Sequence, residues 1–74
     1  MENKLKEARI QKGFSQKQLA SIVGITRPAL SNIERGEVAP GSIVLLKLCK
    51  AVGKKVEEIF FIPSVLHEEH KYDI

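Results

Sequence analysis

Residues 15–36 read SQKQLASIVGITRPALSNIERG, and this pattern predicts two short helices joined at a glycine. Ser15 and Gln18 have the S-x-x-Q spacing of a capping box, in which each side chain satisfies an unpaired backbone N–H at the start of a helix. Gly24 ends this first helix, because glycine adopts the positive φ of a tight turn at no steric cost. The stretch therefore begins with a short helix that starts after Ser15 and ends before Gly24.

Thr26 is the expected N-cap of the second helix, which runs to about Arg35 before Gly36 ends it. Pro28 falls at the second helical position, where the missing N–H of proline is one that has no intrahelical partner in any case. The helix is therefore expected to be intact. Its first turn presents a rigid apolar surface beside Arg27.

The two helices together have one apolar side and one polar side. The apolar residues, which a common core would bury, are Leu19, Ala20, Val23, Ile25, Leu30 and Ile33. The residues left on the outer side are Thr26, Arg27, Pro28, Ser31, Asn32 and Arg35. Each helix is too short to be stable alone, so the pair is expected to act as one rigid unit. Its polar and basic outer side has the wrong character for a core.

Glycines and prolines divide the remainder of residues 1–60 in the same way. Further helices are expected over residues 4–12, 42–52 and 56–60. The apolar side of the 42–52 helix comprises Val44, Leu45, Leu48, Cys49 and Val52. Cys49 is therefore expected to be a buried apolar residue rather than a redox centre.

The chain resembles the lambda-repressor-like (Cro/Xre-type) helix-turn-helix family. The resemblance rests on ARIQKGFSQKQLASIVGITRPALSNIERG, on a later proline, and on the segments LLKLCKAVG and VEEIF. It covers residues 3–61 and implies an all-α, five-helix domain over residues 1–61, with a helix-turn-helix unit at about 15–35. Residues 62–74 are then a C-terminal extension. The resemblance also implies that a recognition helix, residues 27–35, lies in the major groove of DNA.

The resemblance assigns roles to individual residues. Candidates for reading bases are Thr26, Arg27, Pro28, Ser31 and Asn32. Candidates for contacting phosphates are Gln16, Lys17, Arg35, Gly41 and Ser42. Arg27 could bind a guanine bidentately, worth about 1–3 kcal/mol of discrimination, or it could bind a phosphate. Asn32 could likewise pair with an adenine or bind a phosphate. Arg9 and Glu34 are assigned to a structural ion pair.

The segment that begins at Phe60 raises the question of self-association. Residues 60–62 are large and apolar, and Pro63 disfavours a helix in the residue before it, so an extended segment is expected. The alternative is that Phe60 simply fills the core. By resemblance to short family members that dimerise through this region, the interface candidates are Phe61, Ile62, Val65 and Leu66. A two-fold dimer would place two recognition helices about one DNA turn apart.

The charge of the 74-residue chain is +3 and is unevenly distributed. Residues 1–36 hold seven Lys or Arg against three Glu, whereas residues 37–74 hold five Lys against six acids. The basic excess in the first half favours an anionic partner there, with a merely soluble basic surface as the alternative.

Several classes of function are not expected. The sequence has no nucleophile–base pair and no glycine-rich phosphate loop, so a non-enzyme without cofactor is predicted. The HEEH motif of His67 and His70 differs from that of zinc proteases, and no metal site is expected. No apolar stretch is longer than Ile43–Leu46, which is too short to span a bilayer. Cys49 is the single cysteine, which makes a reducing cytoplasm the default location.

The leading hypothesis is a bacterial or phage transcriptional regulator, most simply a repressor. It would bind a pseudo-palindromic operator in double-stranded DNA as a homodimer through residues 27–35. One alternative is an antitoxin-type or accessory protein whose main partner is another protein. Another is the DNA-binding head of a longer, ligand-sensing regulator.

Overall fold

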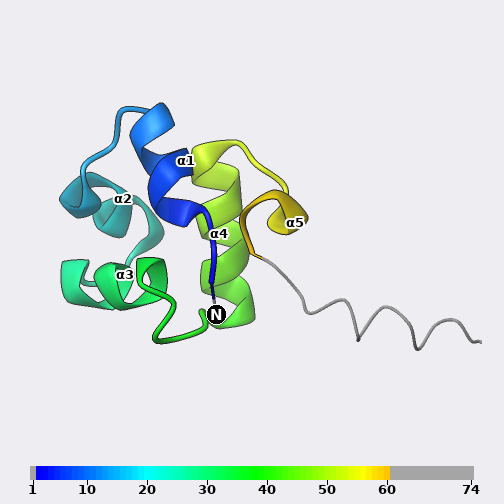
Figure 1. Cartoon of the computed structure of the whole chain (residues 1–74). Helices are drawn as coiled ribbons and strands as arrows, with labels where there is room; N and C mark the ends of the chain where they lie inside the picture. Colours follow the sequence, from blue (N-terminus) through cyan, green and yellow to red (C-terminus); the bar gives the residue numbers. More distant parts are fainter. Residues whose placement is uncertain (1, 61–74) are drawn as a thin grey trace, which may run out of the picture.

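The computed structural model of the protein describes residues 2–60, which form five helices. They are α1 (Leu5–Gln11), α2 (Gln16–Val23), α3 (Arg27–Glu34), α4 (Ser42–Val52) and α5 (Val56–Ile59). α2 packs against both α3 and α4, and α5 packs against α4 (Figure 1). The expected all-α fold of five helices is confirmed. The predicted extension, residues 62–74, lies outside the described residues.

The predicted capping residues start α2 and α3. The Ser15 hydroxyl accepts from the Gln18 backbone N–H at 3.0 Å, and the Gln18 side chain accepts from the Ser15 N–H at 2.8 Å. The Thr26 hydroxyl accepts from the Ala29 N–H at 3.2 Å. Pro28 lies in the first turn of α3 and leaves the helix unbroken. These bonds supply partners to N–H groups that the first turn of a helix leaves without one.

Gly24 makes the tight turn between α2 and α3 with a φ of +79°. The Ile25 N–H donates to the Ala20 carbonyl at 2.9 Å, and the Gly24 N–H donates to the Ser21 carbonyl at 3.3 Å. This pair of bonds is the Schellman closure of a helix end. A Cβ at Gly24 would meet no described atom within 4 Å, so the backbone conformation, rather than lack of space, requires glycine there.

The core gathers side chains from all five helices. The largest fully buried side chains are Leu5, Leu19, Leu30, Leu48, Val52 and Ile59. All the apolar residues predicted for α2 and α3 are buried, and Ile25 between them is partly buried against the core. On α4, Cys49 is buried as expected, whereas Val44 and Leu45 are partly buried. Burial of each large apolar side chain is worth about 1.5–3 kcal/mol, and it stabilises helices that are individually too short.

Phe60 was expected both as the last residue of a 56–60 helix and as the first residue of an extended segment, and the structure has the second. The helix ends at Ile59, and Phe60 is extended with φ −110° and ψ 126°. An antiparallel bridge pairs Phe60 with Asn3, and the Lys4 N–H donates to the Ile59 carbonyl at 2.8 Å. This pairing replaces a further helical turn, and the Phe60 side chain, 3% exposed, belongs to the core. The predicted interface residues Phe61, Ile62, Val65 and Leu66 lie outside the described residues.

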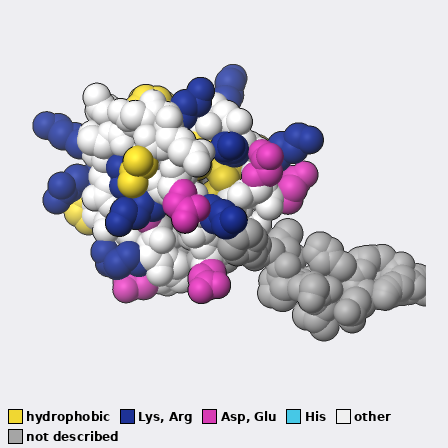
Figure 2. Space-filling model, turned by 45° about the horizontal axis from the view of Figure 1, so that its top comes forward, with side chains coloured by type: hydrophobic (Ala, Val, Ile, Leu, Met, Phe, Trp, Pro, Cys, Tyr) yellow, Lys and Arg dark blue, Asp and Glu magenta, His cyan; other side chains and the backbone are white. Residues whose placement is uncertain are grey.

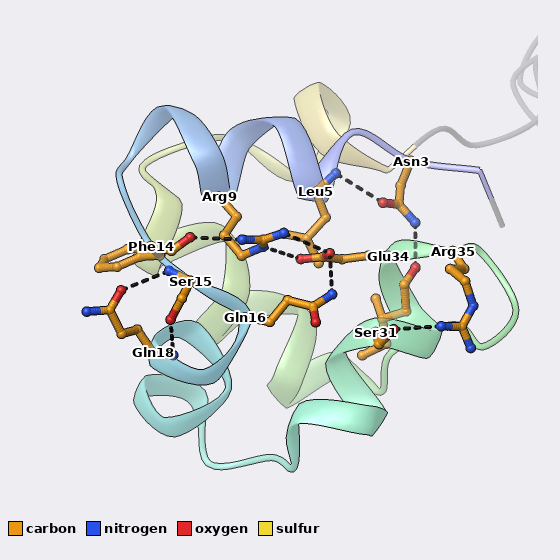
Figure 3. A network of polar contacts seen from close by, with 11 residues as sticks. Asn3, Leu5, Arg9, Phe14, Ser15, Gln16, Gln18, Ser31, Glu34 and Arg35 are labelled. Carbon is orange, nitrogen blue, oxygen red and sulfur yellow. Dashed lines mark hydrogen bonds and ion pairs between the residues drawn. The ribbon is translucent and has the colours of Figure 1, made fainter.

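Asn3 joins the start of the chain to the end of α3. Its Oδ1 atom accepts from the Leu5 N–H at 3.0 Å, which gives the first turn of α1 a partner. Its Nδ2 atom donates to the Ile33 carbonyl at 2.8 Å, in the last turn of α3 (Figure 3). The Ile33 carbonyl also accepts from the Gly36 N–H at 3.0 Å, so Asn3 adds a second hydrogen bond at the end of α3.

Candidate nucleic-acid interface

The outward side of α3 is polar apart from Pro28. Successive residues of an α-helix turn by about 100° around the axis. On α3 this places five of the predicted residues within an arc of about 140°, in the order Arg27, Ser31, Arg35, Pro28 and Asn32. Leu30 and Ile33 on the opposite arc are buried. We call the outward arc, together with the N-cap Thr26, the recognition surface.

Arg27 opens α3 with an exposed guanidinium. Lys17 in the first turn of α2 is exposed as well. Within residues 2–60, neither side chain has a hydrogen-bond or ion-pair partner. Both cations can therefore bind DNA without first breaking an internal bond.

Arg35, by contrast, is held by four hydrogen bonds. Its Nη1 atom donates to the Ser31 hydroxyl at 2.6 Å, and its Nη2 atom donates to Oδ1 of Asn32 (Figure 3 draws the Ser31 contact). Its Nε and Nη2 atoms also donate to the two carboxylate oxygens of Glu37, each at 3.3 Å. The hydrogen bond to Glu37 and its charge raise the pKa of Arg35, and the same contact lowers the pKa of the Glu37 carboxyl.

The Arg35 contacts determine what Ser31 and Asn32 can offer to DNA. A guanidinium only donates hydrogen bonds, so the amide atom that faces it must be the oxygen of Asn32. The Nδ2 group of Asn32 and the O–H of Ser31 are then left as donors. Bidentate pairing with adenine needs the amide oxygen as well. Of the two roles predicted for Asn32, this geometry favours contact with an acceptor such as a phosphate oxygen.

A buried ion pair fixes the orientation of α3 relative to α1 and α2 (Figure 3). Nε of Arg9 lies 2.6 Å from Oε2 of Glu34, and the two side chains are 9% and 3% exposed. Arg9 also donates to the Phe14 carbonyl at 2.9 Å, in the loop before α2. Nε2 of Gln16 donates to Oε1 of Glu34 at 3.0 Å. The structure thus brings together the two residues assigned to an ion pair and adds Gln16, a predicted phosphate contact, to them.

The start of α4 exposes the remaining predicted phosphate contacts, Gly41 and Ser42. Gly41 is the N-cap, with no side chain to accept from the N–H groups of the first turn. These N–H groups point out of the helix end and are available to an anion. An apolar hollow lined by Ile25, Val38, Pro40 and other residues separates this helix end from α3.

The exposed charges are mixed rather than gathered. Figure 2 shows Lys and Arg side chains spread over the visible face, with acidic side chains among them.

Within residues 2–60, no three His, Cys, Asp or Glu side chains form a group that could hold a metal ion. No helix of the same segment is long and apolar enough to cross a membrane. His67 and His70 lie outside the described residues.

Sequence reasoning placed these side chains on one surface but missed two of their contacts. The pairing of Glu37 with Arg35 was not predicted. The four-residue spacing of Ser31 and Arg35 on one helix was a signal for their contact. Gln16 was predicted without its bond to Glu34, which depends on the packing of α2 against α3.

Comparison with known proteins gives consistent matches along the chain. A family model described as helix-turn-helix matches residues 5–59. The HTH-type transcriptional regulator YgzD of Bacillus subtilis is 42% identical over 62 residues, which cover 84% of this chain and 94% of YgzD. The HTH-type transcriptional regulator PuuR of Escherichia coli is 40% identical over 61 residues, which cover 82% of this chain and 33% of PuuR.

A solved structure agrees with these matches. The restriction-modification controller protein C.AhdI from Aeromonas hydrophila superposes with a TM-score of 0.68 at 36% identity, covering 76% of this chain and 85% of C.AhdI. The family match spans more than half of the chain and includes both α2 and α3. The chain therefore belongs to the lambda-repressor-like helix-turn-helix family of DNA-binding transcriptional regulators.

Proposed function

We propose that this regulator recognises a specific DNA sequence through the recognition surface of α3. The observation that carries the proposal is the contrast between the two sides of this helix. Leu30 and Ile33 are buried, whereas Arg27 is exposed and has no partner within the described residues. An unengaged guanidinium in the first turn of a recognition helix suits the O6 and N7 atoms of guanine, or else a phosphate.

Around this centre, the phosphate contacts would fix the register of the protein on DNA. Lys17 at the start of α2 and the backbone at Gly41 and Ser42 present positive or donating groups on two further elements. Phosphate contacts of this kind position a protein without reading sequence. We propose that base reading therefore falls mainly to the first turn of α3.

We further propose that the regulator acts as a homodimer on a pseudo-palindromic operator and represses transcription from it. Phe61, Ile62, Val65 and Leu66 supply the apolar residues for the interface. On the described part of the chain, Ile43 and Leu46 lie on α4 with 69% and 62% of their surfaces exposed, which also supports association. Non-enzymatic action in the cytoplasm is part of the same proposal.

Selection of bound duplexes from a random DNA pool tests this function. The expected result is enrichment of one sequence with two inverted half-sites about one helical turn apart. Failure to enrich any sequence, with retention of all duplexes alike, would reject sequence-specific recognition. Enrichment of a single, asymmetric site would reject the dimeric arrangement, and sedimentation at tens of micromolar would check the same point independently.

The second candidate function is binding of a different protein. The exposed Ile43 and Leu46 side chains favour it if the homodimer does not bury them. Replacement of both by Lys separates the two possibilities. Loss of the dimer in sedimentation would assign these residues to self-association. An unchanged dimer would leave them available to a different protein, such as the partner of an antitoxin.

A further inference from the structure

Glu37 is the exposed acid next to the recognition surface. Between Thr26 and Ser42 the charged residues are Arg27, Glu34, Arg35 and Glu37. The Glu34 side chain is 3% exposed and is engaged in the buried ion pair, whereas the Glu37 side chain is 60% exposed. Glu37 is therefore the acid of this segment that an approaching DNA backbone would meet.

We propose that Glu37 competes with DNA phosphates for Arg35 and thereby sets the strength with which the recognition surface binds the DNA backbone. The proposal rests on the proposed DNA-binding function and assigns a regulatory role at the same surface to a residue outside α3. Arg35 is then a phosphate contact whose availability is controlled within the protein.

The atoms that Arg35 uses support this competition. Glu37 occupies the edge formed by Nε and Nη2, which is the edge that binds a carboxylate or a phosphate bidentately. Ser31 accepts from the other terminal nitrogen, Nη1. A phosphate that replaced Glu37 could therefore use the same edge while the contact with Ser31 persisted. The guanidinium would need little reorientation for the exchange.

The exchange is also energetically accessible. The Arg35 and Glu37 side chains are 54% and 60% exposed, and the two hydrogen bonds between them are long at 3.3 Å. Exposed ion pairs of this kind are weak, because water and salt screen them. The lowered pKa of Glu37 means that the carboxylate stays charged near neutral pH, so it remains a competitor under ordinary conditions. Glu37 thus weakens the Arg35–phosphate contact without preventing it.

Measurement of DNA affinity for Glu37→Gln tests the proposal. The probe is a 20-base-pair duplex of random sequence, and the matched control is Glu7→Gln. Glu7 is an exposed acid on α1 that lines a hollow with Lys4, Lys54 and Glu58, away from the recognition surface. Glu37→Gln is expected to raise affinity by about two- to fivefold, the range that loss of one exposed ion pair allows, and Glu7→Gln by less.

The decisive comparison repeats Glu37→Gln in an Arg35→Met background. If Glu37 acts through Arg35, the gain in affinity falls to that of the Glu7→Gln control. An equal gain with and without Arg35 would overturn the proposal, because it would mean that Glu37 acts only through its general negative charge. An unchanged affinity in Glu37→Gln would overturn it as well. Circular dichroism checks that all four variants keep their helices.

This experiment is separable from the test of the proposed function. A protein that binds no duplex at low salt would reject DNA binding itself. A protein that binds duplex, but for which the Glu37→Gln effect does not depend on Arg35, would reject the competition alone. Because phosphate contacts carry no sequence information, the gain should be the same for a selected operator and for random DNA.

Discussion

The side-chain amide of Asn3 donates to the carbonyl oxygen of Ile33 at 2.8 Å, across thirty positions of sequence. Ile33 is the last buried residue of α3, and the bond joins the recognition helix to the segment that precedes α1. The position of the recognition surface therefore depends in part on a residue that lies outside α2 and α3. The same Asn3 side chain also caps α1 through Leu5.

Asn3→Ala should lower the free energy of unfolding by about 1–2 kcal/mol, because it removes the bond that caps Leu5 and one of the two hydrogen bonds to the Ile33 carbonyl. In a domain of this size such a loss lowers the unfolding temperature by about 4–8 °C per kcal/mol, which circular dichroism can follow. Asn3→Ser is the control, since serine can still cap Leu5 but is too short to reach Ile33. Wild-type stability in Asn3→Ser would show that the Ile33 bond contributes nothing.

Arg9→Met should destabilise the domain by about 3–5 kcal/mol, because the Glu34 carboxylate would remain buried without its cation. Urea unfolding measures the loss. The double variant Arg9→Met, Glu34→Leu should be more stable than Arg9→Met alone, since no uncompensated charge is then buried. Additive losses in the double variant would contradict this account. Arg35→Met, which breaks an exposed pair, should unfold at nearly the wild-type temperature.

Gly24→Ala should cost about 1–2 kcal/mol, because a side chain disfavours the left-handed backbone conformation of the turn. Gly41→Ala is the matched control. Its φ of −66° suits any residue, and at both sites an added Cβ meets no described atom within 4 Å. A much smaller loss in Gly41→Ala is expected in thermal unfolding. Equal losses would mean that the backbone conformation at Gly24 is not the cause.

Arg27→Ala and Lys17→Ala should weaken DNA binding in different ways. Arg27→Ala is expected to abolish the preference for a selected operator over random duplex, whereas Lys17→Ala should weaken both about equally. Lys17→Ala should also reduce the slope of log affinity against log salt by about one unit, as expected for one lost phosphate contact. Equal loss of specific and non-specific binding in Arg27→Ala would reassign Arg27 to the phosphate contacts.

Cys49 should remain a protonated thiol well above neutral pH. Burial, and secondly the charge of Glu57, raise its pKa. A thiol whose pKa is higher in the folded than in the unfolded state binds its proton more tightly when folded, so it lowers the stability as the pH rises past the unfolded value. The free energy of unfolding of wild type should therefore fall relative to that of Cys49→Ala as the pH rises from 7 to 9.5. A pH-independent difference would contradict this.

The helix boundaries could be predicted because local chemistry determines them. Ser15 and Thr26 cap α2 and α3 through bonds to residues three positions away, and Gly24 takes the expected turn. The apolar spacing likewise identified the core. The contacts of Asn3 and Glu37 could not be derived in this way. Asn3 meets Ile33 only after α1 and α3 have packed, and Glu37 reaches Arg35 only because the chain turns back after α3.

The end of α5 illustrates the same limit. Residues 56–60 have helical spacing, whereas the apolar run 60–62 and Pro63 predict an extended segment that begins at Phe60. The competing interaction comes from the other end of the chain, where Asn3 pairs with Phe60. The non-local backbone pairing thus accompanies the second of these two local expectations for Phe60.

The pairing of Asn3 with Phe60 has a topological consequence. Backbones joined by an antiparallel bridge lie about 5 Å apart, so the two ends of the folded segment, residues 3 and 60, lie next to each other. Residues 3–60 could therefore be inserted as a unit into a surface loop of another protein, or closed into a ring by a linker of a few residues, with the recognition helix still presented on the outside.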